Sequence, residues 1–555
     1  MENLELFRQL GNRLRELEIS DFHFKSIVGM NAYNQYVLEN RIPALMKLSE
    51  NSSSENIFYK FFLLGKETTA SELQNLLGET IFVALLEHNF IEYFDVSDKN
   101  LDLDGNLQDS VYFSPKINIS CYNLENNKDT VPIYVISDLK RISTNSNIDN
   151  EYVMSIGGAS KSLAKMIIKD NAFRQYFDEN IDNPTAVDIG CGSGIQALIL
   201  AKLGYETYAT DISEKALMYT NYNAVLNDVE ITTICGSLFE PLENLDCKFD
   251  LIVSNPPFVI TAEQVRKNNK YTYRDGGMKN DDLLMHFISN VSAFLKEKGI
   301  ATFLGNWEER YDLPKFDDKH ENKLLKAIPN NTDIWVIKRQ EQTPEEYVKL
   351  WMDDAQSLKN SKEEYENKYC LWLEDFKNRN IENISFGYFI LQKSKGTETV
   401  WKKIENGIQY LHQPTGEVVL KTLVAKENLF KIRKNSSRDI FDYKYLRPSH
   451  VTEERYYIPG QSDPHSIYMV QGGSLGRKKQ LTSLEAAFIG ACDGELTASQ
   501  ICEAIAYLLV TQNNNESDDS QFNADTEKEN ILNGIIEEIA NFIETSLIEG
   551  FLEVI

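Results

Sequence analysis

Two short runs of the sequence combine residue types that could bind a nucleotide-like cofactor and a planar nitrogen. The first run is Val187-Asp188-Ile189-Gly190-Cys191-Gly192-Ser193-Gly194, between an apolar strand-like segment and the helix-like segment 195–202. Glycines at such a turn let the backbone approach a ligand, because side chains there would block it. Asp211 follows Gly190 by 21 residues and ends the second predicted strand, where a carboxylate can accept hydrogen bonds from both hydroxyls of a ribose.

The spacing of the glycines distinguishes between two kinds of cofactor. It is G-x-G-x-G, with an acid two residues ahead of the first glycine, and not the G-x-G-x-x-G of dinucleotide-binding folds. We therefore expect S-adenosylmethionine rather than a nicotinamide dinucleotide. Each acid also has a structural alternative. Asp188 can brace its own loop, a role that can coexist with binding, and Asp211 can be an acid at a helix N-terminus with Ser213 as the cap.

Other residues near these turns complete the predicted cofactor site. We expect contacts from Cys191, Ile212, Ser237, Leu238 and Asn255 in addition to the two acids and the three glycines. Cys191 is interpreted as a loop residue and not as a nucleophile, because nothing near it in the sequence supplies a base. Upstream, the segment 156–160 either closes over the cofactor or is a plain turn at the start of a helix.

The second run, Asn255-Pro256-Pro257-Phe258, follows the predicted strand 249–254 and lies 61 residues after Gly194. An amide or exocyclic amine is a weak nucleophile, so a site that alkylates it must hold its lone pair toward the reacting carbon. The side-chain oxygen of Asn255 and the carbonyl of Pro256 can accept both of its N–H bonds. The two prolines restrict the backbone, and the Phe258 ring can stack on a planar group. We predict that these four residues form the catalytic site.

Strands and helices must bring these two turns together. From residue 185 to about residue 392, apolar strands alternate with helices, which is typical of a doubly wound parallel sheet in an α/β fold. A charged helical stretch, 345–376, is interpreted as a surface insertion. The seven predicted strands are 185–189, 206–210, 230–235, 249–254, 299–304, 333–337 and 386–391.

The segment Asp188 to Phe258 resembles a family of N-methyltransferases that includes release-factor glutamine methyltransferases, small-domain ribosomal RNA guanine methyltransferases and adenine-amino DNA methyltransferases. The resemblance covers about 200 of the 555 residues. It implies a seven-stranded, Rossmann-like class I methyltransferase core and an S-adenosylmethionine-dependent enzyme. It also implies cofactor contacts from Asp188, Asp211 and the three glycines, and target contacts from Asn255, Pro256 and Phe258. This chain has Ser237 where the family often has an acid that binds adenine.

Flanking regions divide the chain into three predicted domains, 1–150, 151–393 and 394–555. In the first, two short helices near residues 69–88 precede a strand at 91–96, a pattern that a winged helix shares. The third begins with predicted strands at 408–411 and 418–423 and ends in helices, among them a second helix-turn-helix candidate at 481–506. Such modules bind nucleic acid, hold substrates or dimerise, and the sequence leaves the oligomeric state open.

Charge and cysteine content restrict the partners. A formal net charge of -27 argues against binding of a nucleic-acid phosphate backbone over a large surface of the protein. One stretch, residues 421–447, is nevertheless basic, with eight basic and three acidic residues. The seven cysteines are scattered without metal-binding spacing, so we expect no metal. No signal-peptide pattern and no long apolar run is present, so we expect a cytoplasmic protein without membrane contact.

The methyl acceptor is the open question. Within the resemblance, Phe after the two prolines is commoner in guanine-modifying RNA enzymes, and Tyr is typical of glutamine and adenine modifiers. The possible winged helices and the basic stretch favour a nucleic acid, RNA above all, while the acidic balance favours a protein glutamine or other amide. A small molecule and a non-catalytic cofactor-binding protein are further alternatives.

Overall fold

The computed structural model describes residues 2–95, 111–126, 129–140, 143, 151–177, 183–266, 276–313, 323–355, 362–394, 400–407, 415–434, 439–473, 475–514 and 521–555. The chain divides into two compact units, each described here by itself. One unit contains residues 1–170 and 181–406, and the other contains residues 171–180 and 407–555.

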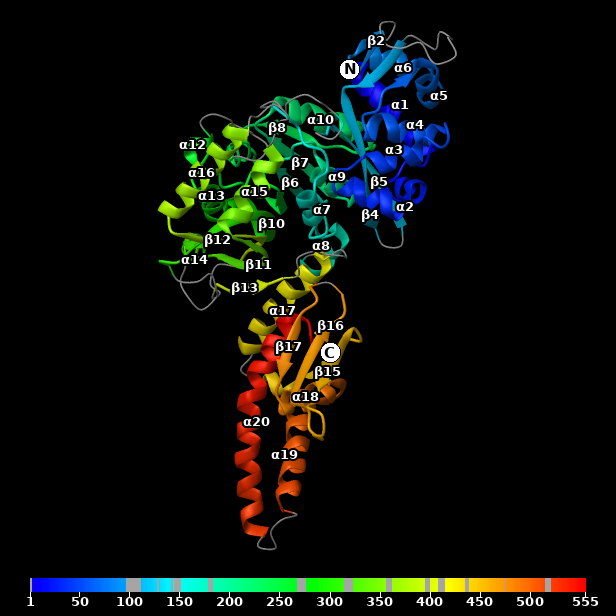
Figure 1. The fold of residues 1–555 in the computed structure, drawn as a ribbon. Coiled ribbons are helices and arrows are strands. Elements are labelled where there is room, and N and C mark those ends of the chain that lie inside the picture. The colour runs from blue at the N-terminus through cyan, green and yellow to red at the C-terminus, as the bar shows by residue number, and fades with distance from the viewer. Residues whose placement is uncertain are drawn as a thin grey trace. The chain divides into compact units, whose positions relative to one another are not determined.

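An eight-stranded mixed sheet forms the centre of the first unit (Figure 1). Its order is β13-β11-β12-β10-β9-β6-β7-β8, in which β12 runs antiparallel to β10 and β11 while the other neighbours run parallel. The strands are β6 (Thr185–Ile189), β7 (Glu206–Asp211), β8 (Thr232–Cys235), β9 (Phe249–Ser254), β10 (Leu295–Arg310), β11 (Thr332–Gln342), β12 (Ile381–Lys393) and β13 (Lys402–Asn406).

The predicted fold class, an α/β core of the class I methyltransferase kind, is confirmed, but the sheet is mixed and not wholly parallel as predicted, because β12 runs antiparallel to both of its neighbours. All seven predicted strands are present, and the bounds of β6 and β9 are those predicted. The eighth strand, β13, was not predicted. Its sequence, Lys-Lys-Ile-Glu-Asn, has a single apolar residue, because β13 lies at the edge of the sheet and none of its side chains is fully buried.

Helices connect and cover the strands. Buried apolar residues of β6, β9, β10, β11 and β12 pack in one core with those of α13, η3 and α14. The helices of this part are α7 (Gly158–Ala164), α9 (Ile195–Lys202), α10 (Glu214–Leu226), α11 (Glu240–Glu243), α12 (Glu263–Arg266), α13 (Asp282–Asn290), η3 (Val291–Phe294), α14 (Lys323–Ala327), α15 (Pro344–Ala355) and α16 (Lys362–Asn378).

The helical stretch between β11 and β12 is more than a surface insertion. Tyr347, Trp372 and Phe376 are buried and pack with Val259 and Ile260, which directly follow Phe258. The Tyr347 hydroxyl accepts a hydrogen bond from the Ile260 backbone at 2.9 Å, and the Trp372 indole donates to the Ile260 carbonyl at 3.1 Å. Because charged residues dominate the sequence of this stretch, its buried aromatic face, which supports the Asn-Pro-Pro-Phe loop, was not predicted.

The N-terminal part of the first unit combines a helical layer with a three-stranded sheet and a long hairpin. The two predicted short helices and the strand after them are present. The sheet has the order β1-β3-β2, and β4 pairs with β5. The elements are α1 (Glu2–Glu16), α2 (Asp21–Val37), α3 (Ile42–Leu48), α4 (Ser54–Phe58), η1 (Tyr59–Leu63), β1 (Thr68–Thr69), α5 (Ala70–Leu77), α6 (Glu79–Glu87), β2 (Ile91–Asp95), β3 (Val111–Pro115), β4 (Ile117–Asn126) and β5 (Asp129–Asp138).

The second unit has two small sheets, β18-β14-β19 and β15-β16-β17, and α19 and α20 lie side by side (Figure 1). The predicted strand 418–423 is wrong, because Val419, Leu420 and Leu423 are buried at helical spacing within α17. The predicted strand 408–411 lies outside the described residues. The elements are α8 (Asp170–Phe177), whose first residue belongs to the other unit, α17 (Gly416–Lys434), η4 (Ile440–Asp442), β14 (Lys444–Leu446), β15 (Val451–Tyr456), β16 (Ser466–Gln471), β17 (Lys478–Leu481), α18 (Ser483–Gly490), β18 (Asp493–Thr497), α19 (Ala498–Asn514), α20 (Gln521–Glu549) and β19 (Glu553–Val554). No helix among the described residues is both long and apolar enough to cross a membrane.

Candidate active site

The glycine turn and the Asn-Pro-Pro-Phe loop leave the sheet side by side. β6 and β9 are parallel neighbours, with Ile189 opposite Ser254 in the register. The Ser254 hydroxyl donates a hydrogen bond to the Ile189 carbonyl at 2.7 Å and joins the last residues of the two strands. Because the carboxyl ends of parallel strands share one edge, Gly190 and Asn255 begin their turns next to each other.

All three glycines of the turn have left-handed backbone angles, with φ of 71° at Gly190, 56° at Gly192 and 82° at Gly194. A Cβ added at Gly190 or Gly192 would meet no protein atom within 4 Å, whereas at Gly194 it would lie 2.7 Å from the Thr220 hydroxyl. The first two glycines therefore border open space, as a ligand cradle requires. Gly194 instead allows the close packing of α9 on α10.

Asp211 ties the glycine turn to the end of β7. One carboxylate oxygen accepts a hydrogen bond from the Gly192 backbone at 2.9 Å, and the other accepts one from the Ser213 backbone at 2.9 Å. A carboxylate has about four acceptor positions, so two stay open for hydroxyl groups. Ser213 caps α10 through a bond from the Ala216 backbone at 3.2 Å. Both sequence interpretations of Asp211 are thus compatible with its position.

Asp188 is fully buried beneath the turn. One oxygen accepts a hydrogen bond from the Ala197 backbone at 3.1 Å, so the acid braces its own loop. The other oxygen has no hydrogen-bond partner. Burial, with a smaller contribution from the nearby Asp211, raises the pKa of Asp188 to about 8. A buried carboxyl group with an unused oxygen favours a cationic or hydrogen-donating ligand nearby.

The remaining predicted cofactor contacts lie around the same edge. Cys191 is buried, with its sulfur 3.4 Å from the Thr220 hydroxyl, and burial raises the pKa of its thiol well above the usual value. A neutral thiol agrees with its interpretation as a loop residue. Ile212 is exposed next to Asp211, and the Gly236 backbone donates to the Asp211 carbonyl at 3.0 Å, which brings Ser237 and Leu238 to the same edge.

The Asn255 side chain is held under helix α7. Its amide nitrogen donates to the Ser160 hydroxyl at 3.3 Å, and its side-chain oxygen is buried without a hydrogen-bond partner. The Ser160 carbonyl accepts a bond from Gln196 of α9 at 2.9 Å. Gly157 is the N-cap of α7, so the segment 156–160 starts a helix and also covers the asparagine.

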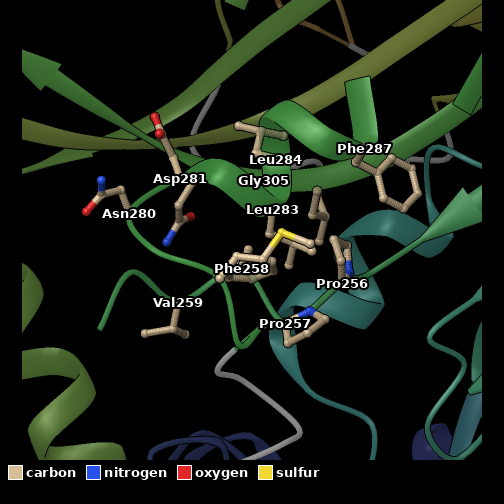
Figure 2. A pocket seen from close by; sticks show the side chains of 14 residues that line it. Pro256, Pro257, Phe258, Val259, Asn280, Asp281, Leu283, Leu284, Phe287 and Gly305 are labelled. Atoms are coloured by element: carbon tan, nitrogen blue, oxygen red, sulfur yellow. The ribbon is translucent and has the colours of Figure 1, made fainter. Parts of the chain in front are cut away.

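Phe258 borders a pocket with about 370 Å³ of open space. Figure 2 shows Phe258 close to Leu283, with Pro256 and Pro257 on one side and Asn280 on the other. The half-buried Phe258 ring lies 5.1 Å from the Phe386 ring, measured between centroids. The ring and its apolar neighbours suit a flat group, while polar residues form the rest of the pocket wall.

Polar residues that sequence reasoning did not assign lie at the back of this pocket. Asn306 is buried and donates to the Tyr347 hydroxyl at 2.9 Å, while its side-chain oxygen has no hydrogen-bond partner. The Asp281 carboxylate pairs with Lys323 and accepts a bond from the Glu308 backbone at 3.2 Å. Figure 2 shows this carboxylate directed away from Phe258, so Asp281 supports the pocket wall. No sequence motif marks these residues, because their partners are distant in the chain.

Two buried asparagines, Asn223 on α10 and Asn227 at the C-cap of that helix, join the N-terminal part to this edge of the sheet. Asn227 accepts a bond from the Tyr134 backbone at 2.8 Å and donates to its carbonyl at 2.6 Å. One turn earlier, Asn223 pairs in the same way with Ile136, at 2.7 and 2.9 Å, and also donates to the Ser193 carbonyl at 2.8 Å. A single side chain thus connects β5 with the glycine turn.

The residues at this edge fit S-adenosylmethionine. The turn has open space at two glycines, Asp211 has acceptor positions to spare, and the buried Asp188 has an unused oxygen. Among the described residues, no group of three or more His, Cys, Asp or Glu side chains could hold a metal ion.

Known proteins resemble this region of the chain. Residues 170–271 match the family model described as the methyltransferase small domain. The chain is 38% identical over 123 residues to a release factor glutamine methyltransferase of Flavobacterium psychrophilum, over 21% of this chain and 41% of that one. It is 32% identical over 127 residues to a putative protein N5-glutamine methyltransferase of Methanocaldococcus jannaschii, over 22% and 63%.

The name of a third relative gives ribosomal RNA as its substrate. The chain is 25% identical over 133 residues to a ribosomal RNA small subunit methyltransferase C of Alcanivorax borkumensis, over 24% of this chain and 35% of that one. The chain therefore spans less than two thirds of the length of each of these three relatives. The predicted resemblance to N-methyltransferases is confirmed for the region around the glycine turn and the Asn-Pro-Pro-Phe loop.

Proposed function

We propose that this protein transfers a methyl group from S-adenosylmethionine to a planar nitrogen, most favourably the exocyclic amine of an RNA base. The observation that supports it best is the register of β6 and β9, which sets the glycine turn and Asn255 at adjacent strand ends. When bound, the cofactor supplies a sulfonium methyl group, whose carbon an acceptor lone pair can attack in line while the neutral thioether, S-adenosylhomocysteine, leaves.

The glycine turn and the two acids would hold the cofactor. Backbone at Gly190 and Gly192 can approach it closely, and the open acceptor positions of Asp211 suit the ribose hydroxyls. The unused oxygen of Asp188 lies beneath the turn and would face positive charge on the ligand. Cys191, Ile212, Ser237 and Leu238 would contribute contacts along the same edge.

The Asn-Pro-Pro-Phe loop would hold the acceptor. The Asn255 oxygen and the Pro256 carbonyl would each accept one N–H of the acceptor amine, which leaves the nitrogen lone pair directed at the methyl carbon. The rigid prolines keep both acceptors in place, and the acceptor ring would stack on Phe258. Once the N–C bond forms, the nitrogen releases its proton to water, so no separate base is needed.

An RNA base is favoured by the half-buried ring of Phe258, which borders the pocket and can stack on a planar base. A protein glutamine is the second candidate, because two of the relatives are named as glutamine methyltransferases. The basic stretch 421–447 weighs less than its composition suggests, since Arg433 pairs with Glu544 and Lys421 lies 3.8 Å from both Glu417 and Glu553.

Methyl transfer to fractions of a cell extract would decide between these acceptors. The full chain is incubated with tritiated S-adenosylmethionine and separated RNA, DNA, protein and small-molecule fractions. Label that nuclease releases and protease does not supports the RNA acceptor. Label that only protease releases supports glutamine, and the Asn255→Ala variant controls for label that this site does not transfer. Tight cofactor binding without transfer to any fraction would refute the proposed activity.

A further inference from the structure

Two buried carboxamide oxygens near the Asn-Pro-Pro-Phe loop are available to a ligand. One belongs to Asn255, to which the acceptor amine is assigned above. The other belongs to Asn306, which is 3% exposed and lines the same pocket as Phe258. Neither oxygen accepts a hydrogen bond from any residue that the structure describes. Folded proteins leave few buried acceptors unpaired, so each of these oxygens favours a ligand that brings a hydrogen-bond donor.

The register of the sheet sets the distance between these two asparagines. Ser254, the last residue of β9, is opposite Phe303 of β10, and Asn306 lies three positions further along β10. Asn255 begins its loop one position beyond Ser254. Neighbouring strands are about 4.8 Å apart and rise about 3.3 Å per residue, which separates the two backbones by roughly 8 Å. One base can therefore contact both side chains.

The Asn306 side chain also shares a face of the sheet with the ring that packs on Phe258. Asn306 is opposite Phe386 in the antiparallel pair of β10 and β12, and opposite residues of such a pair point to the same face. The Phe386 ring lies 5.1 Å from the Phe258 ring between centroids. A base that stacks on Phe258 would therefore have the Asn306 amide beside its edge.

Hydrogen bonds at its nitrogen fix the Asn306 amide in place. This nitrogen donates to the hydroxyl of the buried Tyr347 at 2.9 Å. The same hydroxyl accepts a hydrogen bond from the Ile260 backbone at 2.9 Å, two residues after Phe258. Because the nitrogen is engaged, the oxygen is the end of the amide that a ligand can use. An amide oxygen can only accept hydrogen bonds.

An acceptor at this position selects among groups that carry a planar amine. In guanine the 2-amino group is adjacent to a ring N–H, which is a donor. In adenine and cytosine the ring nitrogen beside the amine is an acceptor, and in glutamine the neighbour of the amine is a carbonyl oxygen. Two acceptors that face each other leave both unpaired, and such a mismatch rejects a ligand strongly. Guanine alone among these four supplies the donor.

We infer that Asn306 is a specificity-determining residue, whose oxygen accepts the ring N–H of a guanine while Asn255 and the Pro256 carbonyl hold its amine. The inference rests on the proposed transfer to an RNA base and narrows that base to guanine. Asn306 contacts the part of the base beside the reacting nitrogen, so its role is recognition and not the chemical step.

Base analogues test this contact without any methyl transfer. The full chain is first saturated with S-adenosylhomocysteine, which occupies the cofactor site. Guanosine monophosphate, 2-aminopurine riboside monophosphate and adenosine monophosphate are then titrated separately, and their binding is followed by saturation-transfer NMR. The 2-aminopurine ring keeps the amine of guanine but has an acceptor in place of the ring N–H.

Three variants assign the contact to Asn306. Asn306→Leu removes the acceptor at similar volume, and Asn306→Asp keeps an acceptor. Asn378→Leu is the matched control, because it makes the same change at an exposed residue of the first unit that does not line the pocket. The native chain, the control and Asn306→Asp should bind the guanine nucleotide at least about tenfold more tightly than the other two nucleotides. In Asn306→Leu the preference over 2-aminopurine should fall below about threefold.

Equal binding of the guanine and 2-aminopurine nucleotides by the native chain overturns the inference, as does binding of neither. Tighter binding of the adenine nucleotide or of a glutamine peptide overturns it as well, and so does a preference that Asn306→Leu retains. If Asn306→Leu does not fold, the native chain and Asn306→Asp still decide. A guanine preference without methyl transfer to any extract fraction would refute the proposed activity alone, whereas labelled RNA without that preference would refute the role of Asn306 alone.

Discussion

The two asparagines at the C-terminal end of α10 allow the link between the N-terminal part and the glycine turn to be measured. Both side chains pair with the backbone of β5, but only Asn223 also donates to the Ser193 carbonyl. Asn223→Ala leaves three buried backbone groups without their partner, and Asn227→Ala leaves two at Tyr134. At about 1–3 kcal/mol for each such group, both variants should lose several kcal/mol of unfolding free energy.

Cofactor affinity should separate the two variants. The bond to Ser193 has a net value of about 1 kcal/mol, which corresponds to a roughly fivefold to tenfold change in a dissociation constant. Titration calorimetry with S-adenosylhomocysteine should therefore show weaker binding for Asn223→Ala by about that factor and a change below twofold for Asn227→Ala. Urea unfolding of both variants supplies the matching stability measurement.

Equal loss of affinity in both variants would refute this reasoning, because it would mean that affinity follows general stability and not the bond to the turn. Unchanged affinity in Asn223→Ala would refute it as well. If Asn223→Ala unfolds, Asn223→Asp keeps the bond accepted from Ile136 and removes the two donated bonds, so the same comparison remains possible.

Four further predictions concern the site itself. Asn255→Ala should lower methyl transfer by about a hundredfold or more and leave the dissociation constant for S-adenosylhomocysteine nearly unchanged; loss of cofactor binding would mean that the loop is misassigned. Asp211→Ala should raise the dissociation constant for S-adenosylhomocysteine as its first effect, and methyl transfer should fall because less cofactor is bound. Gly192→Ala should weaken cofactor binding because its Cβ enters open space, beside a loss of stability from its left-handed φ of 56°. Gly194→Ala carries similar backbone strain and adds contact with Thr220, so it should lower the unfolding midpoint more than Gly192→Ala does; the opposite assignment of effects would exclude a cradle at Gly192. Asp188 has a folded-state pKa near 8, above its unfolded value of 3.8, so its protonated form stabilises the fold at low pH and that stability is lost as the pH rises toward 8. Asp188→Asn should gain unfolding free energy relative to the native chain by up to about 1.4 kcal/mol per pH unit between pH 5 and 8, and a pH-independent difference would contradict the burial of an ionisable group there.

The sequence predicted the parts of the site that depend on local order. β6 and β9 are short apolar runs bounded by glycines or prolines, so their ends, and with them Gly190 and Asn255, could be located within the chain. The sheet order of the class I core then placed the two turns at one edge.

The missed features depend on contacts between distant residues. Nothing in the sequence near Asn223 indicates that its amide pairs with β5, 87 residues away. The support of the Phe258 loop by Tyr347 and Trp372 was hidden in a stretch dominated by charged residues. The error at α17 arose from its adjacent valines, which favour a strand by propensity although their spacing with Leu423 is helical.

The burial of the Asn255 oxygen has a consequence for the sequence of events at the site. This oxygen is enclosed by protein atoms while Ser160 engages the other end of the same amide. An incoming amine must therefore displace protein atoms, and not solvent, before the Asn255 oxygen can accept a hydrogen bond from it. Entry of the acceptor is then coupled to a movement of the segments that enclose this oxygen, and the hydrogen bond to Ser160 makes α7 one of them.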